Sequence, residues 1–140
     1  MTINEIQEEL IDDFSFYQDW MEKYEYIIQL GKEVPLIKEE YKTDNYIIKG
    51  CQSKVWLYPE MRDGRVYFSA DSDAIITKGL VSLMVKVLSG HTPQEIASTE
   101  LYFIDKIGLT EHLSPTRANG LLSMVKQMKL YAVALQMKSS

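Results

Sequence analysis

The chain has 140 residues, of which 46% are hydrophobic and 25% charged, and it carries a net charge of −5. This length suits a single domain spanning residues 1–140, and the composition excludes disordered, collagen-like and low-complexity chains. The acidic balance argues against nucleic acid as a partner. No apolar stretch approaches the ~20 residues that cross a bilayer, and the N-terminus lacks a basic signal region. We therefore expect a cytoplasmic protein that binds neither nucleic acid nor membrane.

Two helices are predicted at the N-terminus. Thr2 and Glu5 have the spacing of a capping box, and the first helix should run to about Asp13. The second should end at Gly31, with Pro35 beyond it as a stop. Apolar residues recur at helical intervals in both: Ile3, Ile6, Leu10 and Ile11, then Tyr17, Trp20, Met21, Tyr24, Ile27 and Ile28. Charges interrupt the apolar period over residues 34–44, which we interpret as a solvated connector.

A cluster of strands follows the connector. Residues 46–48, 55–58 and 66–69 are rich in branched and aromatic side chains, which is typical of strands. Asp63-Gly64 is the signal of a tight hairpin turn between the last two. Pro59 must then lie at a strand edge or bulge. We expect a small antiparallel sheet of about three strands.

The remainder of the chain predicts helices. One should cover residues 74–88 and end at Gly90, a short one should open at Thr92-Pro93, and a long one at Ser114-Pro115. The long helix keeps a core-facing seam of Leu121, Val125, Met128, Ala132 and Leu135. Helices, strands and helices in this order predict an α+β fold with the helices packed on one face of the sheet.

Asp71 and Asp73 precede the helix over residues 74–88 and have two interpretations. Their carboxylates, or the Ser72 hydroxyl between them, can accept the free amides at the start of the helix. A metal-binding Asp-x-Asp pair is the alternative, and we favour capping.

Cys51 is the residue best suited to chemistry. It is the only cysteine, which excludes an internal disulfide and any cysteine-rich metal or iron–sulfur site within one chain. Gly50 gives the backbone freedom for a turn here, and the flanking Lys49 and Lys54 should favour the reactive thiolate. The alternative is that Cys51 is simply a small buried hydrophobic residue.

Arg117 and the two histidines are the other candidates. Arg117 is at the third position of the last helix, where the helix dipole disfavours a cation, so another interaction could hold it there; the alternative is an ordinary surface arginine. His91 and His112 lack the spacing of a zinc site, and we interpret both as structural or solvated. We expect no metal and no cofactor in this chain.

The segment Gly50-Cys51-Gln52-Ser53-Lys54-Val55-Trp56 resembles the signature of the SufE/CsdE family of sulfur-acceptor proteins. Residues 71–80 and 109–121 resemble the second and third conserved blocks of that family. The similarity extends over nearly the whole chain.

This resemblance implies a covalent sulfur carrier and desulfurase activator with an α+β fold similar to IscU. Cys51 would accept persulfide sulfur from a PLP-dependent cysteine desulfurase of the SufS/CsdA type and pass it toward an iron–sulfur scaffold of the SufB type. Arg117 matches an arginine that the family places near the acceptor loop. Gly50, Gln52 and Ser53 would complete that loop, and Lys49, Lys54, Asp71 and Asp73 would contact the partner. Cluster scaffolding does not carry over to a chain with one cysteine.

The carrier role implies a shielded thiol. We expect Cys51 to rest among apolar neighbours, which raises its pKa, and to emerge when the desulfurase docks. Two alternatives stay open: a regulatory module that acts by contact alone, and a single-cysteine redox enzyme, which the lack of a histidine near Cys51 in sequence disfavours. The sequence also leaves open whether the protein forms a homodimer.

Overall fold

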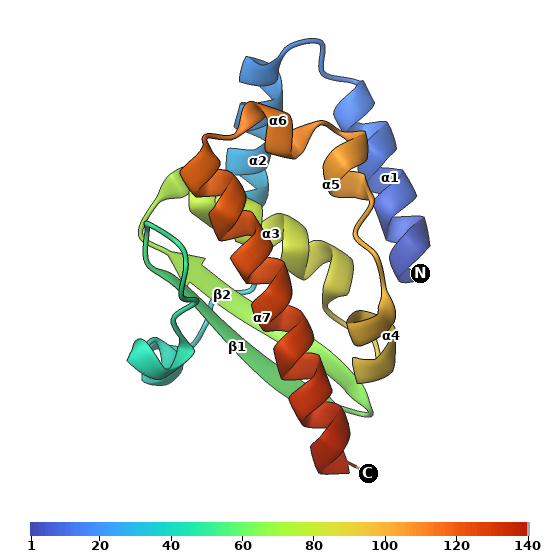
Figure 1. The fold of residues 1–140 in the computed structure, drawn as a ribbon, viewed down its shortest axis with the longest axis vertical. Helices are drawn as coiled ribbons and strands as arrows, with labels where there is room; N and C mark the ends of the chain where they lie inside the picture. The colour runs from blue at the N-terminus through green and yellow to red at the C-terminus, as the bar shows by residue number, and fades with distance from the viewer. Residues whose placement is uncertain (140) are drawn as a thin grey trace.

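The computed structural model describes residues 1–139 and has an α+β fold (Figure 1). Two helices, α1 (Ile3–Ser15) and α2 (Trp20–Gly31), come first, and two 3-10 turns follow, η1 (Glu39–Tyr41) and η2 (Asp44–Tyr46). Strands β1 (Val55–Arg62) and β2 (Arg65–Ser72) form a hairpin. The chain ends in α3 (Ile75–Leu88), α4 (Pro93–Ser98), α5 (Phe103–Lys106), α6 (Leu109–His112) and α7 (Pro115–Ser139).

Local signals start α1, α4 and α7 and form the hairpin turn as predicted. Thr2 and Thr92 each form a capping box with a glutamate three residues later, and Pro93 and Pro115 occupy the first turns of their helices. Asp63 and Gly64 adopt φ values of 51° and 79°, the left-handed pair that a two-residue hairpin turn requires. The antiparallel register of β1 and β2 therefore runs unbroken from Arg62 opposite Arg65 to Val55 opposite Ser72.

The sheet has two strands, not about three. The predicted strand over residues 46–48 is reduced to one bridge between Ile47 and Trp56, because η2 ends at Tyr46 and the chain turns at Gly50. The hairpin edges are covered instead by single bridges, Ile47 on β1 and Leu36 on β2. Such cover limits edge-to-edge association. Pro59 lies within β1, on an edge strand as expected.

The connector over residues 34–44 is more ordered than predicted. Val34 and Ile37 are buried, and Ile37 donates a backbone hydrogen bond to Ala70 on the β2 edge, whose own N–H donates to the Pro35 carbonyl. Lys38, Glu39 and Glu40 are exposed and Lys42 is partly buried in an ion pair with Asp71, whereas Val34 and Ile37 lie in the core. The number of charged residues therefore gave no indication that this segment packs against the fold. Tyr41 stacks on Tyr58 with ring centroids 3.9 Å apart, on the outer face of the hairpin.

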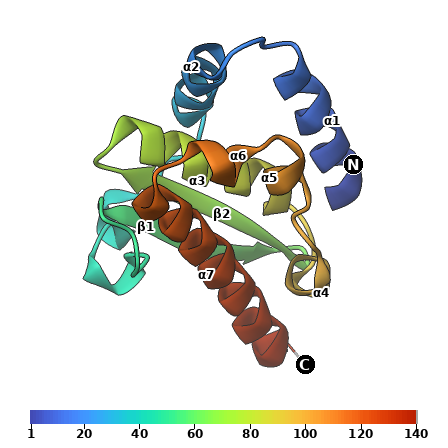
Figure 2. The same ribbon diagram turned by 45° about the horizontal axis from the view of Figure 1, so that its top comes forward.

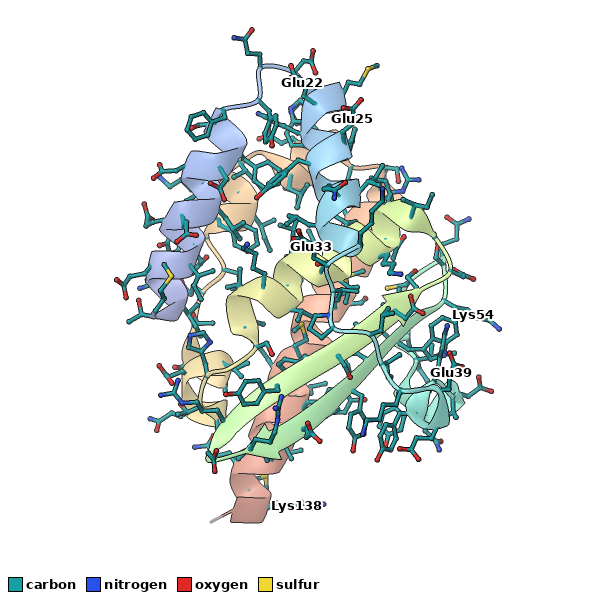
Figure 3. All side chains as sticks on the ribbon, turned by 180° about the vertical axis from the view of Figure 1, so that it is seen from behind. Glu22, Glu25, Glu33, Glu39, Lys54 and Lys138 are labelled. Carbon is teal, nitrogen blue, oxygen red and sulfur yellow. The ribbon has the colours of Figure 1, made fainter. Side chains whose placement is uncertain are left out.

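Helices α3 and α7 cover the inner face of the hairpin, as the views from the front and from behind show (Figures 1 and 3). The strands alternate: their inward side chains Val55, Leu57, Val66, Phe68 and Ala70 are buried. Helix α3 lies centrally, with both α2 and α7 in contact with it. None of the helices within residues 1–139 has the length and apolar character needed to cross a membrane.

Candidate functional site

The Cys51 loop joins two buried residues, Ile48 and Val55, and is fastened at both ends. The N–H of Ile48 donates to the carbonyl oxygen of Val55 over 2.8 Å. At the other end the Lys54 N–H donates to Asp73 Oδ1 over 3.0 Å, and the Lys54 carbonyl accepts from the Ser72 hydroxyl over 2.8 Å. Residues 49–53 are thus a short excursion between two fixed points.

Two glycines let this loop lie against α7. Gly50 has a φ of +96°, and a Cβ there would come within 2.4 Å of Ser123 Oγ. On the helix, a Cβ at Gly120 would lie 3.4 Å from Cys51 Sγ. A side chain at position 50 would therefore push the loop away from α7, whereas the missing side chain at position 120 leaves space beside the thiol.

The Cys51 thiol is half-buried and donates a hydrogen bond to the Gly120 carbonyl oxygen, with Sγ 3.5 Å from that oxygen. Burial raises the pKa of the thiol. Lys49 and Lys54 do not offset this effect, contrary to the expectation that they would favour the thiolate: both side chains are exposed, and Lys54 points away from the molecule (Figure 3). The resting group is a protonated, hydrogen-bonded thiol.

The thiol opens onto a pocket of about 80 Å³ between the loop, α3 and α7. This is room for more than one water-sized group beside Sγ. The loop contributes Cys51, Gln52 and Ser53, α3 contributes Thr77 and Leu80, and α7 contributes Thr116, Arg117, Gly120 and Met124.

Arg117 brings a positive charge to this pocket. Its backbone N–H donates to the Ser114 hydroxyl over 3.3 Å, which confirms Ser114 as the start of the helix. Its side chain is exposed, and no carboxylate within residues 1–139 forms an ion pair with the guanidinium. The structure therefore brings Arg117 to Cys51 with its charge uncompensated, although the two are far apart in sequence.

Asp71 and Asp73 lie near the loop but do not cap α3, so the capping interpretation of the carboxylates is wrong. Asp71 pairs with Lys42 at 2.8 Å and Lys78 at 3.3 Å. Its partial burial would raise its pKa, but the hydrogen bonds from Lys42 and the Ser72 amide, together with the charge of Lys78, outweigh this and hold the pKa below its usual value. Asp73 accepts from Lys54, and only the Ser72 hydroxyl reaches the Ala74 amide at the start of α3.

Neither histidine reaches the pocket. His91 is buried with its ring nitrogens facing the carbonyls of Leu88 and Met1, and His112 stacks on Trp20 with ring centroids 4.0 Å apart. No group of three or more potential metal ligands forms anywhere in the part of the chain described. The pocket thus combines one thiol with a guanidinium, hydroxyls and apolar walls.

The pocket walls were not predicted from the sequence. The wall residues that were not expected at the site are Thr77, Leu80, Thr116, Gly120 and Met124. A signal for two of them was present, because positions 117, 120 and 124 follow the i, i+3, i+7 spacing of one helix face. No local pattern, however, indicates that this face meets Cys51.

Fold and site together define a small α+β protein with one shielded cysteine on a loop held against a helix. A family model described as SufE, an Fe-S metabolism associated domain, matches residues 8–132. The chain belongs to the SufE family, and this membership connects it with iron–sulfur metabolism.

Individual relatives agree with this assignment. Uncharacterized SufE-like proteins of Rhizobium meliloti and Rhizobium etli are 40% and 42% identical over 127 residues, which cover 87% of this chain and 91% and 86% of theirs. The solution structure of a hypothetical protein from Thermus thermophilus matches with a TM-score of 0.78 at 16% identity, covering 94% of this chain and 96% of that one. The latter supports the fold alone.

Proposed function

We propose that the protein accepts sulfur on Cys51 as a persulfide from a PLP-dependent cysteine desulfurase, stimulates that enzyme, and passes the sulfur on to an iron–sulfur scaffold of the SufB type. The observation that carries the proposal is the placement of the only thiol of the chain on a fastened loop beside a pocket with an uncompensated arginine. Membership of the SufE family supports the connection with iron–sulfur metabolism.

The transfer is a thiol exchange at sulfur. The Cys51 thiolate attacks the terminal sulfur of the donor's cysteine persulfide, a new bond forms between Sγ and that sulfur, and the donor's sulfur–sulfur bond breaks. The donor cysteine leaves as a thiolate. The proton that Cys51 lost is balanced by the proton that the donor thiolate takes up. Nothing is oxidised or reduced overall, so one cysteine is enough. Delivery repeats the exchange with Cys51 as the donor.

The resting geometry protects the thiol between transfers. Exchange and oxidation both depend on the thiolate fraction and on access to the sulfur. The hydrogen bond to Gly120 and the raised pKa lower the thiolate fraction, and half-burial limits access. Docking of the desulfurase would have to draw Sγ away from Gly120. The fixed points at Ile48 and Lys54 confine that movement to residues 49–53.

Arg117 is proposed to stabilise the anionic forms of this site. Its guanidinium presents five donors and a permanent charge at the pocket, where a thiolate or persulfide anion forms. A lysine offers a point charge without the planar fork, so it is an imperfect substitute.

The partner surface is proposed around the loop. Lys49, Lys54 and Asp73 are exposed and border Cys51, so they are available to a docked desulfurase. Asp71 is less available, because its charge is already paired with Lys42 and Lys78. Charge complementarity at such a rim affects the association rate more than the final affinity.

Persulfide transfer is tested directly by mass spectrometry. The protein is incubated with a cysteine desulfurase, PLP and cysteine, and we expect Cys51 to gain the mass of one sulfur atom, removable by a reductant. Cys51→Ser is the matched control: it should fold and bind the desulfurase but neither gain sulfur nor stimulate. Full stimulation by Cys51→Ser would instead make the protein a regulator that acts by contact alone.

The role of Arg117 is tested in single turnovers. We expect Arg117→Ala to slow persulfide formation about tenfold, because a charged contact worth about 1.4 kcal/mol in the transition state changes a rate by that factor. Arg117→Lys should recover part of the rate. Arg65→Ala removes a guanidinium that instead bonds Gly90 at the other end of the hairpin, and it should have the wild-type rate. Wild-type rates for both Arg117 variants would make Arg117 an ordinary surface residue.

A further inference from the structure

The outer face of α7 carries an apolar row that no part of the described chain covers. Leu122, Leu130 and Val133 are 58%, 52% and 42% exposed. With 3.6 residues per turn, these three and Lys126 fall within an arc of about 80° and extend over about 17 Å. We call these four residues the α7 stripe. Figures 1 and 2 show α7 on the outside of the molecule, with no element in front of it.

A groove of about 580 Å³ runs beside the stripe, between α7 and the segment that leads into the Cys51 loop. Leu130 and Lys126 belong to both the stripe and the groove. The α7 wall also holds Ser123, Gln127 and Tyr131. The opposite wall holds Asp44, Asn45, Ile47 and Lys49. The groove and the stripe thus form one continuous surface, separate from the pocket into which Cys51 opens.

The charge on this surface selects the kind of partner. Helix α7 has no aspartate or glutamate, and of its positively charged side chains Lys126 lies on this surface, whereas Arg117 lines the Cys51 pocket and Lys129 donates to the Thr99 carbonyl oxygen. The two lysines of the groove, Lys49 and Lys126, outnumber its one carboxylate, Asp44. A complementary partner is therefore acidic.

A second copy of the chain does not supply this partner. Two α7 helices facing each other would bring their lysines together without a carboxylate between them. The N-terminal part is acidic, and Figure 3 places Glu22 and Glu25 at the opposite end of the molecule from Lys138. Within residues 1–139, however, α2 and α3 each expose one large apolar residue and α1 exposes none, so none of them can match a three-turn stripe.

We propose that the α7 stripe and its groove dock an acidic amphipathic helix of a partner protein. About three turns of helix, with apolar side chains repeating every three or four residues, would pack on Leu122, Leu130 and Val133. Glutamates or aspartates beside that row would meet Lys126 and Lys49. The interaction uses no cysteine chemistry and does not depend on the persulfide proposal.

The test uses two fluorescent synthetic peptides of about 18 residues, which is roughly five helical turns. Both peptides carry leucines at helical spacing and charged residues at the same other positions. These charged residues are glutamates in the first peptide and lysines in the second. Fluorescence anisotropy should show binding of the glutamate peptide, weakened by salt, and none of the lysine peptide. Lys126→Glu and Leu130→Ser should each weaken binding tenfold or more. Lys86→Glu and Ile75→Ser change an exposed lysine and an exposed apolar residue of α3 and should leave it unchanged.

Other outcomes overturn the proposal. Equal binding of both peptides, or unchanged affinity of Lys126→Glu and Leu130→Ser, would show that the surface does not select an acidic helix. Sedimentation that reveals a wild-type dimer lost in Leu130→Ser would assign the stripe to a second copy. One further measurement separates this surface from the sulfur-accepting site. In an assay that contains only the desulfurase, PLP and cysteine, and no scaffold protein, Leu130→Ser should form the persulfide on Cys51 at the wild-type rate.

Discussion

Glycines allow a close approach at two places in this protein, and the two places differ in whether the neighbouring atoms belong to backbone or to side chains. At the crossing of α2 and α3, a Cβ on Gly79 would lie 2.3 Å from the backbone oxygen of Ile27, and one on Gly31 would lie 2.9 Å from the Gly79 nitrogen. At the Cys51 loop, Gly50 and Gly120 face side-chain atoms, Ser123 Oγ and Cys51 Sγ.

This difference separates a rigid contact from an adjustable one. Backbone packed in a helix crossing cannot move without displacing two helices, whereas a serine or cysteine side chain can rotate. The crossing is further fixed by Ser82, whose buried hydroxyl donates to the Leu30 carbonyl over 2.7 Å. The protein thus holds its core helices rigidly while its thiol rests in a contact that side-chain movement can release.

Gly79→Ala should have the largest effect. Its methyl group would overlap backbone, and overpacking of this kind costs about 3 kcal/mol of unfolding free energy. Urea denaturation measures the loss. Adding Gly79→Ala to Ile27→Ala should cost nearly as much unfolding free energy as adding it to the wild type, because the nearest obstacle is the Ile27 carbonyl oxygen, which alanine retains. No added cost in the Ile27→Ala background would show that the side chain of Ile27, not the backbone, sets the close approach.

Gly50→Ala should have the next largest effect, about 2 kcal/mol, from backbone strain at positive φ together with the overlap on Ser123. Gly64→Ala is the matched control, because Gly64 has a φ of +79° with no atom within 4 Å of the added Cβ, so it reports strain alone. Adding Ser123→Ala should bring Gly50→Ala close to the Gly64→Ala value. If adding Ser123→Ala does not restore unfolding free energy to Gly50→Ala, the loop contact is as rigid as the crossing of α2 and α3.

Gly120→Ala should affect reactivity and stability in opposite directions. Its Cβ would stand 3.4 Å from Sγ, an ordinary contact, and alanine in a helix interior is favoured over glycine by about 0.5–1 kcal/mol. We expect a small rise in unfolding free energy. The same methyl group narrows the space beside the thiol, so alkylation of Cys51 by iodoacetamide should slow several-fold. Alkylation at the wild-type rate would mean that the thiol reacts only after leaving α7.

The pH dependence of Cys51 should be the smallest effect on stability. Burial raises its pKa in the folded state above the unfolded value of about 8.5. The folded protein therefore binds this proton more tightly, and the contribution is complete below the unfolded pKa and is lost as pH rises through the folded pKa. Wild type should lose unfolding free energy relative to Cys51→Ser in this alkaline range. The alkylation rate should rise with a midpoint above about 8.5, and a midpoint below it would mean that a cation stabilises the thiolate.

Local patterns determined much of the fold and the position of the thiol. The capping residues at Thr2 and Thr92, the Asp63-Gly64 turn and the helical start at Ser114 all act through neighbours within three or four residues, so the sequence shows them directly. The segment around Cys51 resembles the family signature through adjacent residues, and the family match agrees with it.

The remaining features depended on residues that are distant in sequence. The predicted third strand is only one bridge at Ile47. The charged segment after Val34 packs against β2, because its backbone hydrogen bonds with Ala70 outweigh its charged composition. Asp73 fastens the Cys51 loop instead of capping α3, because the hairpin brings the Lys54 amide to its carboxylate. The raised pKa of Cys51 and the approach of Arg117 arise only when α7 packs on the loop, because burial and electrostatic environment are properties of the packed chain and not of any local segment.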